Sequence, residues 1–394
     1  MISSEVRRER ESLHILLFDL DAVLLTSEGY YESLRRAVAM LAEALGFGPI
    51  RLSQEDIDVF ESLDITAEWD SCAMCAAMLL IRAWEADPAR TLPERPPLPA
   101  GGLHGLPAPD FRTFALSLAD GEGRVARPLE QARQRLQTSN ANLSPAQSGV
   151  LDRILGQARD PLHSLTFHLI QEFNLGSSLY SEIYGRAGTL HTSGMLAAQD
   201  RPTLSLAERE GLNEWLRAPG RHAAIVTNRP SRSGGSMFNT PEAEIGVRAA
   251  GMDRLPFIAS GALGWFAEQH GLPPQAYLKP SPVHILTGLR LAVDGEVDPA
   301  LAAAHDLVAR GRSQDSWSRF DGARVSLFED AAKGMRGAHA ARESLAGAGV
   351  HVDLRMYGIT GSPAKARALE SLGARVFDTL APALQEAIQD DPTG

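Results

Sequence analysis

The chain has 394 residues, which is too many for a single compact core and predicts two domains. Its formal net charge of -11 at pH 7 repels nucleic-acid phosphates and disfavours anionic membrane surfaces, so we expect neither partner. With 44% hydrophobic and 22% charged residues and no apolar run long enough to span a bilayer, the composition is typical of a soluble globular protein.

Two features of the chain bear on its location. Residues 1–12 carry alternating charges and lack the apolar run of a secretion signal. Cys72 and Cys75 are the only cysteines, and they lie within an apolar segment that reads as the middle of a helix. We interpret them as buried thiols without a disulfide framework, which favours a reducing, cytoplasmic location.

The N-terminal half of the chain predicts one strand followed by a long helical region. The continuous apolar run at residues 14–18 is typical of a buried parallel strand. A helix is predicted at residues 27–45, and helical patterns then continue to about Leu196. The Pro- and Gly-rich residues 88–109 and the polar residues 138–147 interrupt these patterns and are predicted to be long loops.

Local signals mark the ends of several predicted helices. Ser53 with Asp56, and later Ser205 with Glu208, have the spacing of a capping box, which starts a helix. Gly176 is predicted to stop the helix that follows residue 161.

Strands and helices alternate after Leu204. Strands are predicted at residues 223–226, 256–259, 324–328 and 353–357, with helical segments between them. Strands that alternate with helices form a parallel sheet wound on both faces. The predicted fold is therefore α/β: a Rossmann-like, doubly wound core made of residues 13–26 and 197–390, with a large inserted helical cap domain at 27–196.

Two acids, Asp19 and Asp21, directly follow the first predicted strand. In a doubly wound sheet, functional groups gather beyond the carboxyl ends of the strands. One carboxylate there could attack phosphorus while the other transfers a proton to the leaving oxygen and later from water. Taken alone the pattern is weak, because most Asp-x-Asp pairs are loop acids or helix caps.

Three further strand ends carry suitable groups. Thr227 offers a hydroxyl to a phosphate oxygen, and Lys279 offers a positive charge. Glu329 and Asp330 offer carboxylate ligands for Mg²⁺, which prefers oxygen in octahedral geometry. Each of these residues alone could be a loop hydroxyl, a solvated charge or a helix N-terminus, but their common placement at strand ends favours a site.

The order Asp-x-Asp, Thr, Lys-Pro, Glu-Asp is similar to the four motifs of the haloacid dehalogenase (HAD) superfamily. Residues 18–23 (FDLDAV) and 328–335 (FEDAAKGM) resemble the branch of β-phosphoglucomutase and phosphoglycolate phosphatase. The resemblance covers roughly residues 13–44 and 204–387. It departs at Ala22, where this branch usually has Gly, and in the much larger insert.

The resemblance implies a role for each matching residue. It makes Asp19 the nucleophile and Asp21 the acid/base, and it assigns phosphate binding to Thr227, Asn228 and Lys279. It implies that Asp19 and Asp330 bind Mg²⁺ directly. It further implies that Asp21 binds the ion through its backbone carbonyl and Glu329 through a water molecule. Dehalogenases of the superfamily lack the second Asp, so Asp21 favours attack on phosphorus over attack on carbon.

The expected function is a Mg²⁺-dependent phosphatase acting on a small soluble phosphorylated metabolite through an aspartyl-phosphate. Two alternatives stay open: a phosphomutase of the β-phosphoglucomutase type, and a non-catalytic binding or regulatory protein on a HAD scaffold. Arg229 could face the phosphate or the surface with equal weight. The sequence predicts neither the substrate nor the oligomeric state.

Overall fold

The computed structural model describes residues 13–99, 105–120, 125–235, 239–311 and 315–389, and the structural statements below concern these residues. The chain divides into two compact units, a helical unit of residues Ser27–Asp200 and an α/β unit made of the chain on either side of it. The sequence places the second boundary after residue 196. The structure keeps α9 (Met195–Gln199) in the helical unit, because this helix packs on α1 (Glu28–Ala44).

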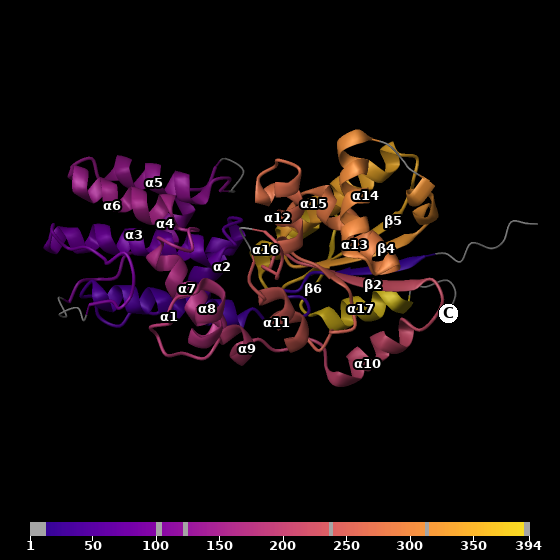
Figure 1. Cartoon of the computed structure of the whole chain (residues 1–394), viewed down its shortest axis with the longest axis horizontal. Helices are drawn as coiled ribbons and strands as arrows, with labels where there is room; N and C mark the ends of the chain where they lie inside the picture. The colour runs from indigo at the N-terminus through magenta and orange to yellow at the C-terminus, as the bar shows by residue number, and fades with distance from the viewer. Residues whose placement is uncertain (1–12, 100–104, 121–124, 236–238, 312–314, 390–394) are drawn as a thin grey trace, which may run out of the picture. The chain divides into compact units, whose positions relative to one another are not determined.

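The α/β unit is built on a six-stranded, wholly parallel sheet (Figure 1). Its strand order is β3-β2-β1-β4-β5-β6, so the direction of winding reverses between β1 and β4. Such a reversal is a topological switch point, where doubly wound sheets bind their ligands. The strands are β1 (His14–Phe18), β2 (Arg221–Val226), β3 (Phe257–Ile258), β4 (Arg324–Glu329), β5 (Asp353–Ile359) and β6 (Arg375–Phe377).

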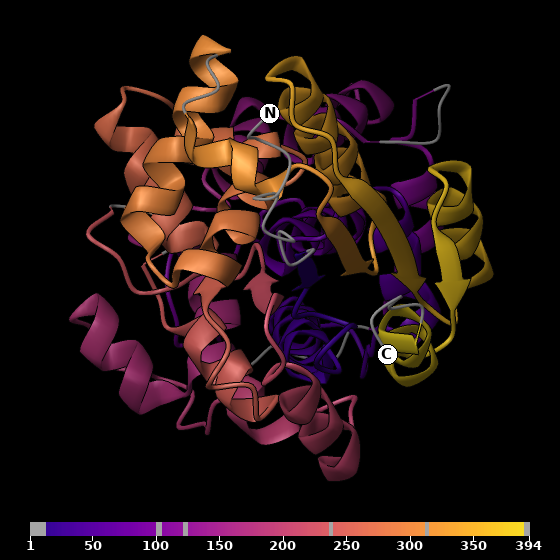
Figure 2. The same ribbon diagram turned by 90° about the vertical axis from the view of Figure 1, so that its right-hand side faces the viewer.

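Helices cover both faces of this sheet (Figures 1 and 2). Ile15 and Leu17 of β1 point into one apolar layer, and Leu16 and Phe18 point into the other, as the two-residue period of a strand requires. The first layer packs against α12 (Ser260–Gln269), α13 (Pro282–Asp294), α14 (Val297–Arg310), α15 (Ala332–Gly347) and α16 (Pro363–Ser371). The second packs against α10 (Leu206–Trp215), α11 (Glu242–Ala249) and α17 (Leu380–Gln389). Two 3₁₀ segments complete the unit, η1 (Pro274–Tyr277) and η2 (Asp315–Phe320). The predicted doubly wound α/β core is confirmed.

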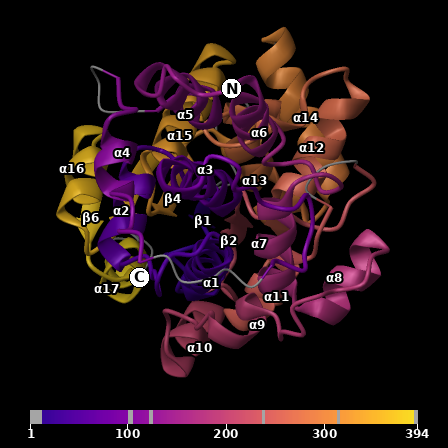
Figure 3. The same cartoon turned by 90° about the vertical axis from the view of Figure 1, so that its left-hand side faces the viewer.

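The inserted unit is helical, as predicted, and Figure 3 labels its helices. Its apolar core lies mainly between α1, α3 and α7. Besides α1 and α9 it contains α2 (Gln54–Ser62), α3 (Glu68–Ala86), α4 (Phe111–Leu116), α5 (Pro128–Ser139), α6 (Pro145–Gly156), α7 (Leu165–Leu175) and α8 (Ser177–Tyr184). In the described part of the chain, every helix is too short or too polar to cross a membrane.

Several local predictions in this unit are confirmed. Ser53 and Asp56 form the expected capping box at α2, and Gly176, at a φ of 82°, ends α7. Cys72 and Cys75 lie inside α3 as buried free thiols, and burial raises the pKa of both. Residues 88–99 and 105–109 contain neither helix nor strand, in agreement with the predicted loop.

Two predicted boundaries are wrong. The polar stretch 138–147 is not a long loop, because α5 runs to Ser139 and α6 starts at Pro145. Its polar residues instead cap the second helix, where Ser144 and Gln147 form a capping box. The strand predicted at 256–259 shrinks to the two residues of β3, which is an edge strand that pairs with β2 alone.

Candidate active site

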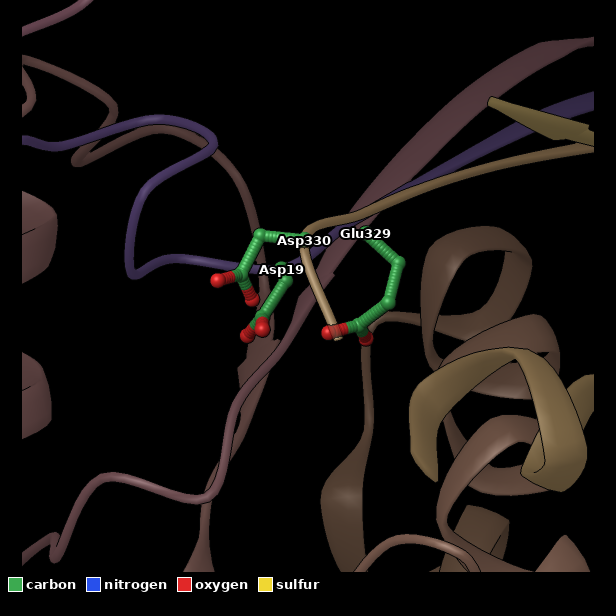
Figure 4. A group of neighbouring side chains, drawn as sticks. All are labelled: Asp19, Glu329 and Asp330. Atoms are coloured by element: carbon green, nitrogen blue, oxygen red, sulfur yellow. The ribbon is translucent and has the colours of Figure 1, made fainter. Parts of the chain in front are cut away.

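Three carboxylates meet at the switch point. Asp19 directly follows β1, and its backbone N–H donates to the carbonyl of Phe328 (2.9 Å), which ties it to the end of β4. Glu329 is the last residue of β4 and Asp330 is the next residue along the chain. One carboxylate oxygen of each of the three lies within 4.8 Å of those of the other two (Figure 4). The parallel register of β1 and β4 therefore gathers acids that are 310 positions apart in the chain.

Lys279 lies among these acids. Its Nζ is 3.0 Å from Asp19 Oδ1 and 2.6 Å from Glu329 Oε2, and only 1% of its side chain is exposed. Burial lowers the pKa of Lys279, but the two carboxylates raise it more, so the net pKa lies above its ordinary value. The ammonium stays charged, and two of its three N–H donors are directed at the acids.

Glu329 is the most deeply buried of the three acids, with no solvent exposure. Burial, and next the nearby Asp19 carboxylate, raise the pKa of Glu329 well above its usual range. Among the described residues nothing donates to or accepts from its Oε1. A buried oxygen in this state, beside two further carboxylates, fits a hard divalent cation that takes only oxygen ligands.

Gly334, in the first turn of α15, makes room for Glu329. A Cβ at Gly334 would lie 1.9 Å from Glu329 Oε2, so Gly334→Ala must displace the buried carboxylate. We expect Gly334→Ala to destabilise the protein by about 1–3 kcal/mol through overpacking. Gly347→Ala at the other end of α15 is the matched control, because a Cβ there meets nothing within 4 Å. It should be neutral or stabilising by up to about 1 kcal/mol, and equal thermal midpoints for the two variants would contradict this argument.

Thr227 and Asn228 follow β2, the other neighbour of β1. Thr227 is buried, and its Oγ1 accepts from the backbone N–H of Arg229 (3.1 Å), which leaves its own hydroxyl proton to donate. The side chain of Asn228, which the resemblance assigns to phosphate binding, accepts at its Oδ1 from the backbone N–H of Lys279 (3.2 Å). In the structure Asn228 thus fixes the segment that carries the lysine.

Asp21 pairs with Arg229, a contact that the sequence analysis missed. The guanidinium donates to both carboxylate oxygens, from Nε to Oδ2 at 2.9 Å and from Nη2 to Oδ1 at 2.5 Å. Only 1% of the Arg229 side chain is exposed, so of its two predicted orientations the one toward the surface is wrong. Bidentate pairing of this kind fixes the carboxylate as well as the arginine.

Ala22, next to Asp21, has a φ of 55°, the left-handed conformation that glycine adopts most readily.

Lys365 is a second group that the motifs did not indicate. It lies in the first turn of α16 and its Nζ donates to Asp330 Oδ2 at 2.8 Å. A signal for it exists in the composition, since the chain has only three lysines among its 38 basic residues: Lys279, Lys333 and Lys365.

Acids and basic side chains alternate in this cluster. Its four acids, Asp19, Asp21, Glu329 and Asp330, face three cations, Lys279, Arg229 and Lys365. A carboxylate at a strand end, an adjacent ammonium and an oxygen-only ligand set are together suited to nucleophilic attack on an anionic group neutralised by a cation.

Neither a model of a known protein family nor a curated protein sequence matches the chain. Solved structures do. A target of the Northeast Structural Genomics Consortium aligns with a TM-score of 0.62 at 16% identity, over 97% of this chain and 100% of that one. Phosphatase Tt82 from Thermococcus thioreducens aligns with a TM-score of 0.44 at 13% identity, over 95% and 99% of the two chains. A hydrolase from Pseudomonas syringae aligns with a TM-score of 0.30 at 14% identity, over 96% and 99%.

The first of these alignments shows that the fold of nearly the whole chain also occurs in a solved structure. Fold and site together define a Rossmann-like α/β protein with a large helical insert and a carboxylate–lysine cluster at the switch point of its sheet.

Proposed function

We propose that this protein is a phosphohydrolase of the HAD type, which transfers a phosphoryl group from a small soluble metabolite to Asp19 and then to water. The observation that carries the proposal is the position of the Asp19 carboxylate. It lies at the end of β1, is paired with Lys279, and shares a cluster with Glu329 and Asp330. An acid held beside a fixed cation, in a cluster with the oxygen ligands for a divalent ion, suits a nucleophile that acts on a phosphate dianion.

In the proposed reaction, Asp19 attacks phosphorus and the bond to the leaving oxygen breaks. Asp21 donates a proton to that oxygen and then removes one from the water that cleaves the aspartyl-phosphate. Lys279 has one N–H donor beyond those directed at the acids, and this donor binds an equatorial phosphoryl oxygen. Thr227 donates its hydroxyl proton to another.

Mg²⁺ is the cation that we propose for the three-carboxylate cluster. Asp19 and Asp330 would hold it directly and Asp21 through its backbone carbonyl. Glu329 would hold it by way of water through Oε1, which has no hydrogen-bond partner among the residues that the structure describes. When bound, the ion would supply positive charge that polarises the phosphoryl oxygens. Three carboxylate oxygens within 4.8 Å of one another favour binding of a cation over binding of an anion alone.

The test is a screen of the purified protein against a panel of phosphorylated metabolites, each with Mg²⁺ and with chelator. Released inorganic phosphate in the Mg²⁺ arm alone is the expected result. Conversion of a phosphorylated sugar into its isomer, stimulated by a bisphosphate, would instead identify a phosphomutase. An absence of turnover across the panel and with p-nitrophenyl phosphate would favour a binding protein and contradict the proposal.

A further inference from the structure

The pair between Lys365 and Asp330 brings a lysine into the acid cluster from a separate element. Lys365 belongs to α16, which follows β5, and β5 pairs with β4 up to Glu329. Because the two strands end at the same edge, the first turn of α16 comes next to Asp330. The ammonium lies 2.8 Å from Asp330 Oδ2, with the two side chains 15% and 14% exposed. A pair this well covered is screened less by solvent than one on the surface.

The chemistry of lysine matters at this position. Three of the 38 basic residues are lysines, and two of these three, Lys279 and Lys365, form ion pairs with the carboxylate cluster. Lysine differs from arginine in carrying a compact point charge with three rotatable donors, where the guanidinium is a broad planar fork. A compact cation can pair with one oxygen of a carboxylate and leave the other oxygen accessible.

The two lysines divide the three acids between them. Lys279 pairs with Asp19 and Glu329, and Lys365 pairs with Asp330. Each acid of the cluster therefore has a cationic partner supplied by the chain itself. The cost of holding three carboxylates within 4.8 Å of one another is reduced without a divalent ion.

We propose that Lys365 is a positioning residue that holds Asp330 in the metal-free protein and lowers the affinity of the cluster for divalent cations. The effect on metal affinity rests on the proposed function, since it takes the cluster as a Mg²⁺ site. The role in holding Asp330 does not. An arriving divalent ion must share Asp330 with the ammonium and is repelled by it. Lys365 thus holds Asp330 in place and competes with a divalent ion for it.

Lys365→Met tests both halves, because it keeps the aliphatic length and removes the charge. In chelator, its thermal midpoint should fall by about 2–6 °C, since Asp330 loses its partner. By titration calorimetry with Mg²⁺ alone, its dissociation constant should be at least about tenfold lower than that of the wild type, since the repulsion is gone. Arg367→Met is the matched control, because it removes one positive charge from an exposed position of the same helix.

The direction in which Lys365→Met changes the affinity for Mg²⁺ distinguishes this proposal from a purely structural role of Lys365. A purely structural lysine would weaken metal binding when it is lost, because Asp330 would be misplaced, and weaker binding in Lys365→Met would overturn the proposal. Midpoints and affinities equal to those of Arg367→Met would overturn it as well. A third outcome is that the wild type binds no Mg²⁺ while the thermal midpoint of Lys365→Met in chelator still falls. The Mg²⁺ part of the proposed function then fails, and the effect of Lys365 on metal affinity fails with it. The role of Lys365 in holding Asp330 stands.

Discussion

Asp19→Asn is expected to lower kcat for every phosphate monoester that the protein hydrolyses by at least about a thousandfold, because an amide cannot form the acyl-phosphate. The variant should stay folded. It removes one of three clustered acids, while Lys279 keeps its 2.6 Å pair with Glu329. Rates with p-nitrophenyl phosphate and the thermal midpoint check the two halves of this expectation. Retention of more than about a tenth of the wild-type rate would rule out Asp19 as the nucleophile.

Asp21→Asn separates the nucleophile from the acid/base. p-Nitrophenolate leaves without a proton, so this variant should still become phosphorylated on Asp19 and then accumulate the intermediate, because water is no longer deprotonated. Mass spectrometry after acid quench should find the added phosphate in Asp21→Asn and none in Asp19→Asn. The thermal midpoint of Asp21→Asn is measured alongside, since the change takes a charge from the buried Arg229.

The fold was largely predictable because its signals are local. Buried parallel strands are continuous apolar runs, and four of the strands, including β1 and β4, were located from such runs. β3 was less well located, since only two of its residues pair with a neighbour. Residues 138–147 were wrongly predicted to be a long loop. Polar residues that cap a helix have the composition of a loop until their hydrogen-bond partners are known.

The candidate site was predictable to the extent that it lies at strand ends. Parallel strands end at the same edge, so Asp19 and Asp330 had to be neighbours once the sheet order placed β1 beside β4. The cations were harder to predict, because a basic side chain reaches its partner through tertiary packing. Arg229 turns to Asp21, and Lys365 reaches Asp330 from 35 positions further along the chain. The scarcity of lysine in the sequence was the only indication of Lys365.

Lys279→Met is the change expected to cost most stability. Lys279 is the shared partner of Asp19 and Glu329. Only 1% of its side chain is exposed, so water cannot take over its hydrogen bonds to the two carboxylates. Loss of one partner from a buried ion pair costs about 3–5 kcal/mol, which corresponds to a fall of roughly 6–20 °C in the thermal midpoint for a unit of this size. Hydrolysis should be lost as well, because the phosphoryl oxygens lose their cation.

A double-mutant cycle identifies the source of that cost. In the Lys279→Met background Glu329 is a buried acid without its cationic partner, so adding Glu329→Gln should restore part of the lost stability. The same change destabilises the wild type, where Lys279 would lose one of its two carboxylate partners. The two changes should therefore be strongly non-additive in calorimetric scans made in chelator. Additive losses would mean that Lys279 stabilises the protein by packing alone, and the electrostatic account of the cluster would fail. Mg²⁺ should raise the midpoint of Lys279→Met more than that of the wild type, because a divalent ion bound to the acids replaces part of the missing positive charge.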